Sequence, residues 1–181
     1  KKLFSLYGLK KTTISDITEI VGIAQGSFYK FYDSKEELYF EILDIEGQKL
    51  RQELAKNLDL VEKKPKDGLK KLLFSTFQNI KENDLFKDLF SGKSYDILVR
   101  KLPQEKIEEH IEMDFAEIIP LIKKWQKKRI LKEAKPEAIT GILHAFFFTT
   151  LHKEEIGESV YQDTFELMIE LIVDGLIKGE A

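Results

Sequence analysis

Hydrophobic residues recur along most of the chain at the three- and four-residue spacing of an amphipathic helix. A clear example is the stripe that runs through Leu69, Leu72, Leu73, Thr76, Phe77 and Ile80. The strict alternation of apolar and polar residues that marks a strand is not sustained anywhere. Only four Pro and ten Gly residues interrupt the 181-residue chain. The pattern therefore predicts an all-α fold with about nine helices.

The first thirty residues carry start and stop signals for three short helices. Gly8 predicts the end of the first helix, because glycine readily takes the left-handed conformation that follows a helix C-terminus. Thr13 opens a capping box, so a second helix is expected to begin there and to end at Gly22. A third helix follows, in which Phe28 and Phe31 lie three residues apart and are expected to face inward.

A second capping box begins at Ser34 and predicts a fourth helix, with Leu38, Ile42 and Ile45 on one stripe. The second and third helices are joined by a tight turn that contains glycine. Two short helices joined in this way form a helix-turn-helix, whose second helix fits the major groove of DNA. A helical packing unit with an ordinary polar face has the same pattern and is the alternative.

The residues expected on the outer side of the third helix have the chemistry that DNA recognition needs. A glutamine can bond to both polar atoms of the adenine edge, a lysine can reach guanine or phosphate, and hydroxyl groups can donate to phosphate oxygens. A lysine in the first turn of the fourth helix would also meet an anion there. These candidates are Gln25, Ser27, Tyr29, Lys30, Tyr32 and Lys35.

The charge of the chain is distributed unevenly. The formal net charge is −3, yet residues 1–35 contain six lysines and three acidic residues, a local charge of +3. The rest of the chain therefore carries −6. A short basic segment on an acidic body suits a protein that contacts a polyanion with one end. No apolar run approaches the roughly 18 residues that cross a bilayer, so no membrane partner is expected.

The residue inventory narrows the function further. Cysteine is absent, which is typical of a reducing, cytoplasmic compartment and excludes disulfides and thiolate metal sites. The segment from Leu3 to Tyr7 resembles the second half of a helix, so we expect a few residues to precede it. His144 and His152 would lie about 12 Å apart along a helix and cannot share a metal ion. Without a phosphate loop or a nucleophile motif, we expect no enzyme, no metal and no cofactor.

The remainder of the chain predicts a larger helical body. A polar connector at residues 62–68 separates it from the first module. A long helix contains Pro120, which either bends that helix or begins a new one. Pro136 predicts the start of another helix. The last helix, residues 165–177, is apolar well beyond a single stripe, so it is either central or in contact with another subunit.

A long series of residues in the first module resembles the N-terminal domain of TetR-type transcriptional regulators. The series is ungapped and runs through Leu3-Phe4, Gly8, Thr12-Thr13, Asp16-Ile17, Val21-Gly22-Ile23, Gly26-Ser27-Phe28-Tyr29, Phe31-Tyr32 and Ser34-Lys35-Glu36-Glu37-Leu38. The resemblance covers about residues 1–46. Beyond them, only the helical character matches.

The resemblance implies a division of labour along the chain. Residues 1–46 would be the helix-turn-helix domain, with its first helix truncated, and residues 47–181 a helical domain for effector binding and dimerisation. Carried over by position, the DNA-binding residues are Thr13, Gln25, Gly26, Ser27, Tyr29, Lys30, Tyr32 and Lys35.

The resemblance also implies a dimer in which the last two helices pair with their copies. We expect Phe146, Thr150, Phe165, Met168, Ile169 and Ile172 in or near that interface. A two-fold dimer would place two reading helices about 34 Å apart, one turn of duplex DNA.

An effector pocket is the remaining expectation for the body. Rigid aromatic side chains suit an apolar ligand, although they suit an ordinary helical core equally well. The candidate lining residues are Phe77, Phe86, Phe90, Tyr95, Phe115, Trp125, His144 and Phe147.

Together these features predict a homodimeric repressor that leaves a palindromic DNA operator when a small, largely apolar effector binds. The fourth helix, residues 35–55, would couple the two modules. Two alternatives remain: a helical interaction or carrier module that does not bind DNA, and a DNA-binding regulator without a small-molecule ligand.

Overall fold

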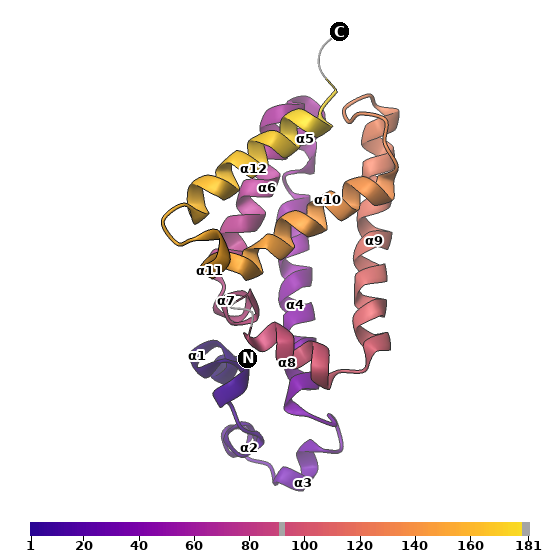
Figure 1. Ribbon diagram of the computed structural model, residues 1–181. Coiled ribbons are helices and arrows are strands. Elements are labelled where there is room, and N and C mark those ends of the chain that lie inside the picture. The colour runs from indigo at the N-terminus through magenta and orange to yellow at the C-terminus, as the bar shows by residue number, and fades with distance from the viewer. Residues whose placement is uncertain (91–92, 179–181) are drawn as a thin grey trace. The chain divides into compact units, whose positions relative to one another are not determined.

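The computed structural model describes residues 1–90 and 93–178 of the chain (Figure 1). These residues form twelve α-helices and one 3-10 helix, with no β-structure beyond a single bridge between Leu131 and Ile177. The all-α prediction is confirmed, and the helix count is higher than the nine expected. The helices are α1 (Lys2–Lys11), α2 (Ile14–Val21), α3 (Gln25–Phe28), α4 (Lys35–Ala55), α5 (Leu58–Lys63), α6 (Pro65–Glu82), α7 (Asp84–Phe90), α8 (Lys93–Lys101), α9 (Gln104–Lys127), α10 (Pro136–Phe148), η1 (Thr149–His152), α11 (Lys153–Ile156) and α12 (Tyr161–Leu176).

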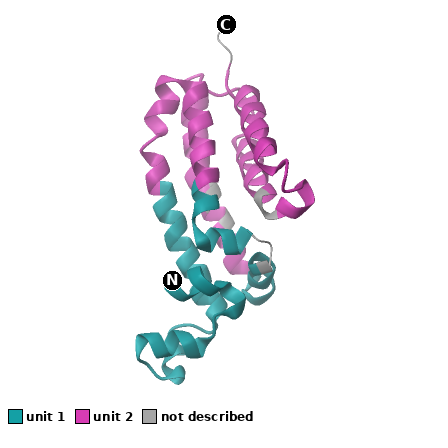
Figure 2. Ribbon diagram, turned by 90° about the vertical axis from the view of Figure 1, so that its left-hand side faces the viewer, with its two compact units in different colours: residues 1–51, 79–104 teal, residues 52–78, 105–181 magenta. Residues whose placement is uncertain are grey.

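The chain divides into two compact units (Figure 2). Unit 1 consists of residues 1–51 and 79–104, and unit 2 of residues 52–78 and 105–181. Helices α7 and α8, which the sequence analysis assigned to the second domain, pack against α1 in unit 1. The compact units therefore do not coincide with the expected domains 1–46 and 47–181, because unit 1 also contains residues 47–51 and 79–104. Helices α4 and α6 each contain residues of both units.

Unit 1 is built around the face of α4 that carries Tyr39, Leu43 and Glu46. The ring of Tyr39 meets Phe4 edge to face at 5.0 Å between centroids. On the predicted apolar stripe of this helix, Leu38 and Ile42 are half-buried, but Ile45 is exposed. The reason is that the Tyr39 hydroxyl and the Glu46 carboxylate find polar partners inside unit 1, so a face with polar atoms can be buried.

Unit 2 has a continuous apolar core formed by α5, α6, α9, α10 and α12. Phe77 of α6 stacks on Phe165 of α12 with 4.4 Å between ring centroids. The predicted α6 stripe is confirmed, since Leu69, Leu73 and Phe77 are buried. Pro136 stands in the first turn of α10, as predicted.

Pro120 lies inside α9, which continues through it to Lys127. Of the two outcomes left open for this proline, the new helix at residue 120 is therefore excluded. Among the described residues, no helix is long and apolar enough to cross a membrane.

Candidate nucleic-acid interface

The predicted capping box opens α2. The Thr13 hydroxyl accepts a hydrogen bond from the Asp16 backbone N–H at 3.1 Å, and the Asp16 carboxylate accepts one from the Thr13 N–H at 2.9 Å. The Thr13 hydroxyl also donates to this carboxylate at 2.6 Å, and these bonds from Thr13 lower the pKa of Asp16. Gly22 ends the helix in the left-handed conformation, at φ 75° and ψ 32°. Both ends of α2 thus match the prediction.

Helix α3 is a single turn, anchored by one buried aromatic ring. Phe28 is 3% exposed, and the rings of Tyr29 and Tyr32 lie 5.6 and 5.8 Å from it. Phe31 was predicted to face inward with Phe28, and this is wrong: it is 74% exposed. The short helix ends at Phe28, so the three-residue spacing of a helix does not extend to residue 31.

Most of the predicted DNA-binding residues lie at the surface of this turn. Gln25, Gly26, Tyr29 and Lys30 are exposed, as is Thr13 at the start of α2. The side chains of Gln25, Tyr29 and Lys30 can therefore be reached by a second molecule, whereas the Thr13 hydroxyl is bonded within the capping box.

Two further members of the predicted set, Ser27 and Tyr32, are half-buried. Partial burial, followed by a hydrogen bond and the charge of Glu41, raises the pKa of Tyr32. The Tyr32 hydroxyl therefore already has a carboxylate partner, and a phosphate contact would compete with it.

Lys35 has a structural role that the sequence did not reveal. Its ammonium donates to the backbone carbonyls of Leu9 at 2.8 Å, Lys10 at 3.3 Å and Thr12 at 2.6 Å. Three carbonyls use all three N–H donors of the group. Lys35 thus satisfies the C-terminal end of α1 instead of presenting free donors, and its predicted phosphate contact stays a prediction.

A second polar centre in unit 1 was missed altogether. Oδ2 of Asp88, on α7, accepts hydrogen bonds from Leu9 N–H at 2.9 Å, Tyr39 hydroxyl at 2.8 Å and Ser94 hydroxyl at 2.9 Å. Burial, and then the charge and hydrogen bond of Asp88, raise the pKa of Tyr39. The sequence offered one signal for this centre: Asp88 lies among the apolar residues of segment 85–90. An acidic residue in such a segment can equally well face solvent, so the signal was not specific.

The predicted effector residues fall into two groups. Phe77 and Trp125 are buried in the unit 2 core, where His144 and Phe147 are half-buried. The Trp125 indole N–H is buried without a hydrogen-bond partner among the described residues. Phe86, Phe90 and Tyr95 belong to unit 1, and the side chain of Phe115 lies outside the described residues.

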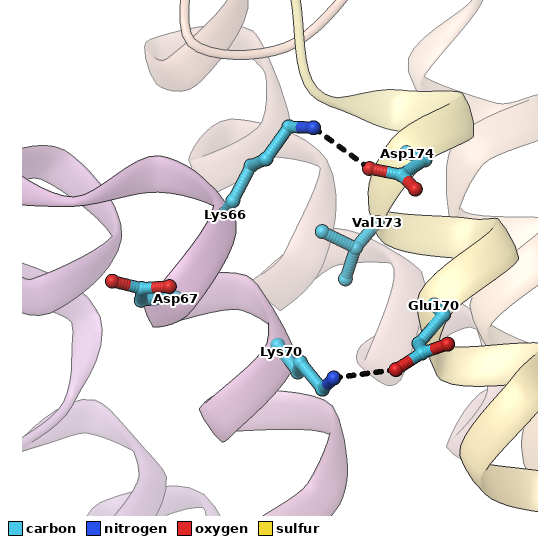
Figure 3. A pocket seen from close by; sticks show the side chains of 6 residues that line it. All are labelled: Lys66, Asp67, Lys70, Glu170, Val173 and Asp174. Atoms are coloured by element: carbon cyan, nitrogen blue, oxygen red, sulfur yellow. Dashed lines mark hydrogen bonds and ion pairs between the residues drawn. The ribbon is translucent and has the colours of Figure 1, made fainter.

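The pocket in Figure 3 has a different lining from the one expected. It lies between α6 and α12 in unit 2 and has a volume of about 240 Å³. Lys66 bonds to Asp174 at 2.8 Å and Lys70 to Glu170 at 2.7 Å, so four of the charged side chains that line the pocket form two ion pairs. The complete lining is Lys66, Asp67, Lys70, Glu170, Val173 and Asp174. Within residues 1–90 and 93–178, no group of acidic or histidine side chains is placed to hold a metal ion.

The structure places the predicted dimer residues in or beside the unit 2 core, and their place in a dimer stays a prediction. Phe146, Phe165 and Ile169 are buried in the unit 2 core. Met168 and Ile172 are half-buried beside that core, and the side chain of Thr150 lies outside the described residues. Because apolar residues lie on most sides of the last helix, the sequence pattern did not show which of them face the core.

Helices α12 and α10 do expose apolar side chains, but these are not the residues predicted for the dimer interface. They are Leu167 and Leu171 on α12 and Ile142 and Phe148 on α10.

Unit 1 thus contains a helix-turn-helix with an exposed polar turn. Residues 1–42 match the family model described as "Bacterial regulatory proteins, tetR family". The HTH-type transcriptional repressor KstR2 of Rhodococcus jostii (strain RHA1) is 44% identical over 62 residues, which cover 32% of this chain. The chain spans 30% of the length of that repressor.

Solved structures with the same fold cover nearly the whole chain. The TetR family transcriptional regulator PfmR from Thermus thermophilus matches with a TM-score of 0.59 at 19% identity, over 96% of this chain and 94% of that one. The ketosteroid transcriptional regulator KstR2 of Mycobacterium tuberculosis matches with a TM-score of 0.52 at 18% identity, over 98% and 91%. Residues 1–42 are therefore similar to the DNA-binding domain of TetR-family transcriptional regulators, and the solved structures share the fold of the chain.

Proposed function

We propose that the protein is a homodimeric, sequence-specific DNA-binding repressor that a small effector releases from a palindromic operator. The observation that carries the proposal is the arrangement of α2 and α3. The first is capped at both ends, and the second is anchored by Phe28 while Gln25, Tyr29 and Lys30 remain exposed. Such a turn can present a glutamine to base edges and hydroxyl and ammonium groups to phosphates.

The charge distribution supports DNA as the partner. Residues 1–35 carry a local charge of +3 on a chain of −3. Each phosphate neutralised by a lysine releases condensed counterions, so binding should weaken steeply as salt rises.

For the dimer, we propose the exposed stripe of α12 in place of the buried residues first expected. Leu167 and Leu171 are four residues apart, on one side of the helix, and are 57% and 64% exposed. An apolar stripe on a soluble surface is typical of a protein interface. Leu171→Glu should shift the protein toward monomer in sedimentation equilibrium, whereas Glu166→Gln should leave the oligomeric state unchanged.

For the effector, unit 2 supplies an aromatic interior, and the Trp125 indole N–H is buried there without a hydrogen-bond partner among the described residues. We propose a largely apolar ligand with a hydrogen-bond acceptor, because such a ligand would satisfy this donor. Trp125 is the single tryptophan of the chain, so its fluorescence reports on this site directly. A saturable change on titration with palmitate or with a 3-ketosteroid supports the proposal, and an unchanged signal with both contradicts this ligand class.

The proposal of DNA binding is tested with a matched pair of tyrosines. Tyr29 and Tyr7 are 56% and 57% exposed, and both lie in unit 1. We expect Tyr29→Ala to weaken binding to a duplex enriched from a random pool at least about tenfold, the size of one good base or phosphate contact. Tyr7→Ala should leave binding unchanged. Equal affinity for wild type and Tyr29→Ala, or affinity that does not depend on salt, would contradict the proposal.

A helical interaction module is the second candidate, favoured by exposed apolar side chains in the same unit. Ile20, Val21 and Phe31 are each more than 60% exposed. Such a surface also suits a protein partner. This candidate predicts no duplex binding by the wild-type chain at any salt concentration.

A further inference from the structure

One carboxylate oxygen in unit 1 joins three helices. Oδ2 of Asp88, on α7, accepts hydrogen bonds from α1 through Leu9 N–H, from α4 through the Tyr39 hydroxyl and from α8 through the Ser94 hydroxyl, at 2.8–2.9 Å. Hydrogen bonds to an ionised acceptor are stronger than neutral ones, and they are directional. Asp88 therefore fixes the positions of these three helices relative to α7.

The backbone of α1 is shaped to receive this carboxylate. Gly8 has φ 72° and ψ 173°, which interrupts the helix and leaves the next N–H, that of Leu9, pointing away from the helical ladder. A Cβ atom at Gly8 would overlap with Oδ1 of Asp88. Only glycine allows both the backbone conformation and the close approach.

The other side of the same short segment is held by α4. Lys35 donates to the carbonyls of Leu9, Lys10 and Thr12, and Tyr39, one helical turn further along α4, donates to Asp88. Residues 9–11 form the end of α1 after the break at Gly8, and Thr12, the C-cap of α1, leads directly into the capping box of α2. We call this set of contacts, formed by Gly8, residues 9–12, Lys35, Tyr39, Asp88 and Ser94, the α1 joint.

The helices that follow the α1 joint have little core of their own. Among residues 13–34, only Thr18 and Phe28 are buried. Two buried side chains supply little non-directional packing to hold α2 and α3 in one orientation. The orientation of these helices relative to α4 therefore depends on the hydrogen bonds at their entry point.

We propose that Asp88 is a positioning residue for DNA recognition: through the α1 joint it sets the orientation in which α2 and α3 meet the duplex. The inference rests on the proposed function and adds to it a residue that lies on α7, outside the helix-turn-helix. Helix α7 follows α6 after the single residue Asn83, which donates to Glu46 of α4 at 3.3 Å.

The test uses the full chain and the duplex that wild-type protein enriches from a random pool. The measured quantity is the ratio of affinities for this duplex and for a scrambled duplex, at a temperature where circular dichroism shows each variant folded. We expect Asp88→Ala to lower this ratio at least about fivefold, while affinity for the scrambled duplex stays unchanged. Asp88→Asn, which keeps one acceptor oxygen, should recover part of the loss.

A control separates positioning from stability. Thr140 of unit 2 is fully buried and donates to the Pro136 carbonyl at 3.0 Å, so Thr140→Val also removes one buried hydrogen bond. It should lower the melting temperature and leave the ratio unchanged. An unchanged ratio in folded Asp88→Ala, or an equal fall in Thr140→Val, would overturn the inference.

If Asp88→Ala does not fold, the inference is tested with variants that each remove a single hydrogen-bond donor to Asp88. Tyr39→Phe and Ser94→Ala each remove one hydroxyl that bonds to Asp88, and each should lower the ratio by a smaller factor; no change in either overturns the inference. A wild-type chain that enriches no duplex is a different result, because it overturns the proposed function and the inference with it.

Discussion

Unit 2 is held together by apolar side chains, including the stacked rings of Phe77 and Phe165, whereas unit 1 depends at several points on polar groups such as Asp88 and Lys35. Apolar burial is non-directional and tolerates small shifts, but a hydrogen bond fixes a distance and an angle. Substitutions in unit 2 should therefore act mainly on stability. Those in the α1 joint should act on the placement of α2 and α3.

The largest effect is expected in the core of unit 2. Phe165 is fully buried and packs against Phe77, Phe146 and Tyr161 with ring centroids 4.4–5.3 Å apart. Phe165→Ala should lower the free energy of unfolding by about 3–5 kcal/mol, measured by urea denaturation, because it leaves a cavity. The adjacent exposed residue provides the control: Glu166→Ala should change this free energy by less than about 0.5 kcal/mol. A loss below about 1 kcal/mol for Phe165→Ala would show that this core is not packed as described.

The next effect falls on the α1 joint of unit 1. Gly8→Ala should cost about 1–3 kcal/mol, because alanine rarely adopts this backbone conformation and its Cβ would meet Asp88. Gly26 lies in the same unit, has open space where a Cβ atom would stand and has no positive φ. Gly26→Ala should therefore leave thermal stability equal or slightly higher. Similar melting temperatures for Gly8→Ala and wild type would contradict the described joint.

A smaller effect is expected at the start of α2. Thr13→Ala removes the hydroxyl that caps this helix and should lower stability by about 1 kcal/mol in thermal unfolding. Ser15→Ala, at an exposed position in the first turn of the same helix, should be close to neutral. Equal destabilisation by both would mean that the cap contributes nothing specific.

The smallest effect concerns the two ion pairs that half-buried Glu62 of unit 2 forms with lysines at the surface. Hydrogen bonds from Lys124 and Lys128 lower the pKa of Glu62 to about 2, from 4.5. A carboxyl with a lowered pKa stabilises the fold fully above its unfolded pKa. This contribution is lost as pH falls from about 4.5 toward 2.

Glu62→Gln should therefore reduce the difference in melting temperature between pH 7 and pH 3. The change should be small and should shrink further in high salt, because solvent screens the pair. Glu137→Gln, at an exposed position of α10, is the control. An unchanged pH dependence in Glu62→Gln would show that the pair does not persist in solution.

Local signals predicted local structure well. The capping box at Thr13, the end of α2 at Gly22 and the start of α10 at Pro136 depend on hydrogen bonds or steric limits within a few residues, so they can be read from the sequence. At Ser34 the prediction was half right. The Ser34 hydroxyl accepts from Glu37 N–H, but the Glu37 carboxylate bonds to the N–H of Asp33.

Facing and long-range contacts were predicted less well. The exposure of Ile45 and Phe31 and the burial of three expected dimer residues have one cause: periodicity shows that a face is apolar but not what covers it. On α12, apolar residues occupy most of the circumference, so Phe165 and Leu167 could not be told apart by pattern. Asp88 bonds to residues 79 and 49 positions away, and no local rule reports such pairs.

The most direct test of the account is a selection of random DNA duplexes by the full chain at moderate salt, followed by sequencing. The account predicts an enriched palindrome with half-sites about one duplex turn apart, bound by a dimer through α3 of each copy. No enriched sequence from correctly folded protein would contradict it and favour a helical interaction module.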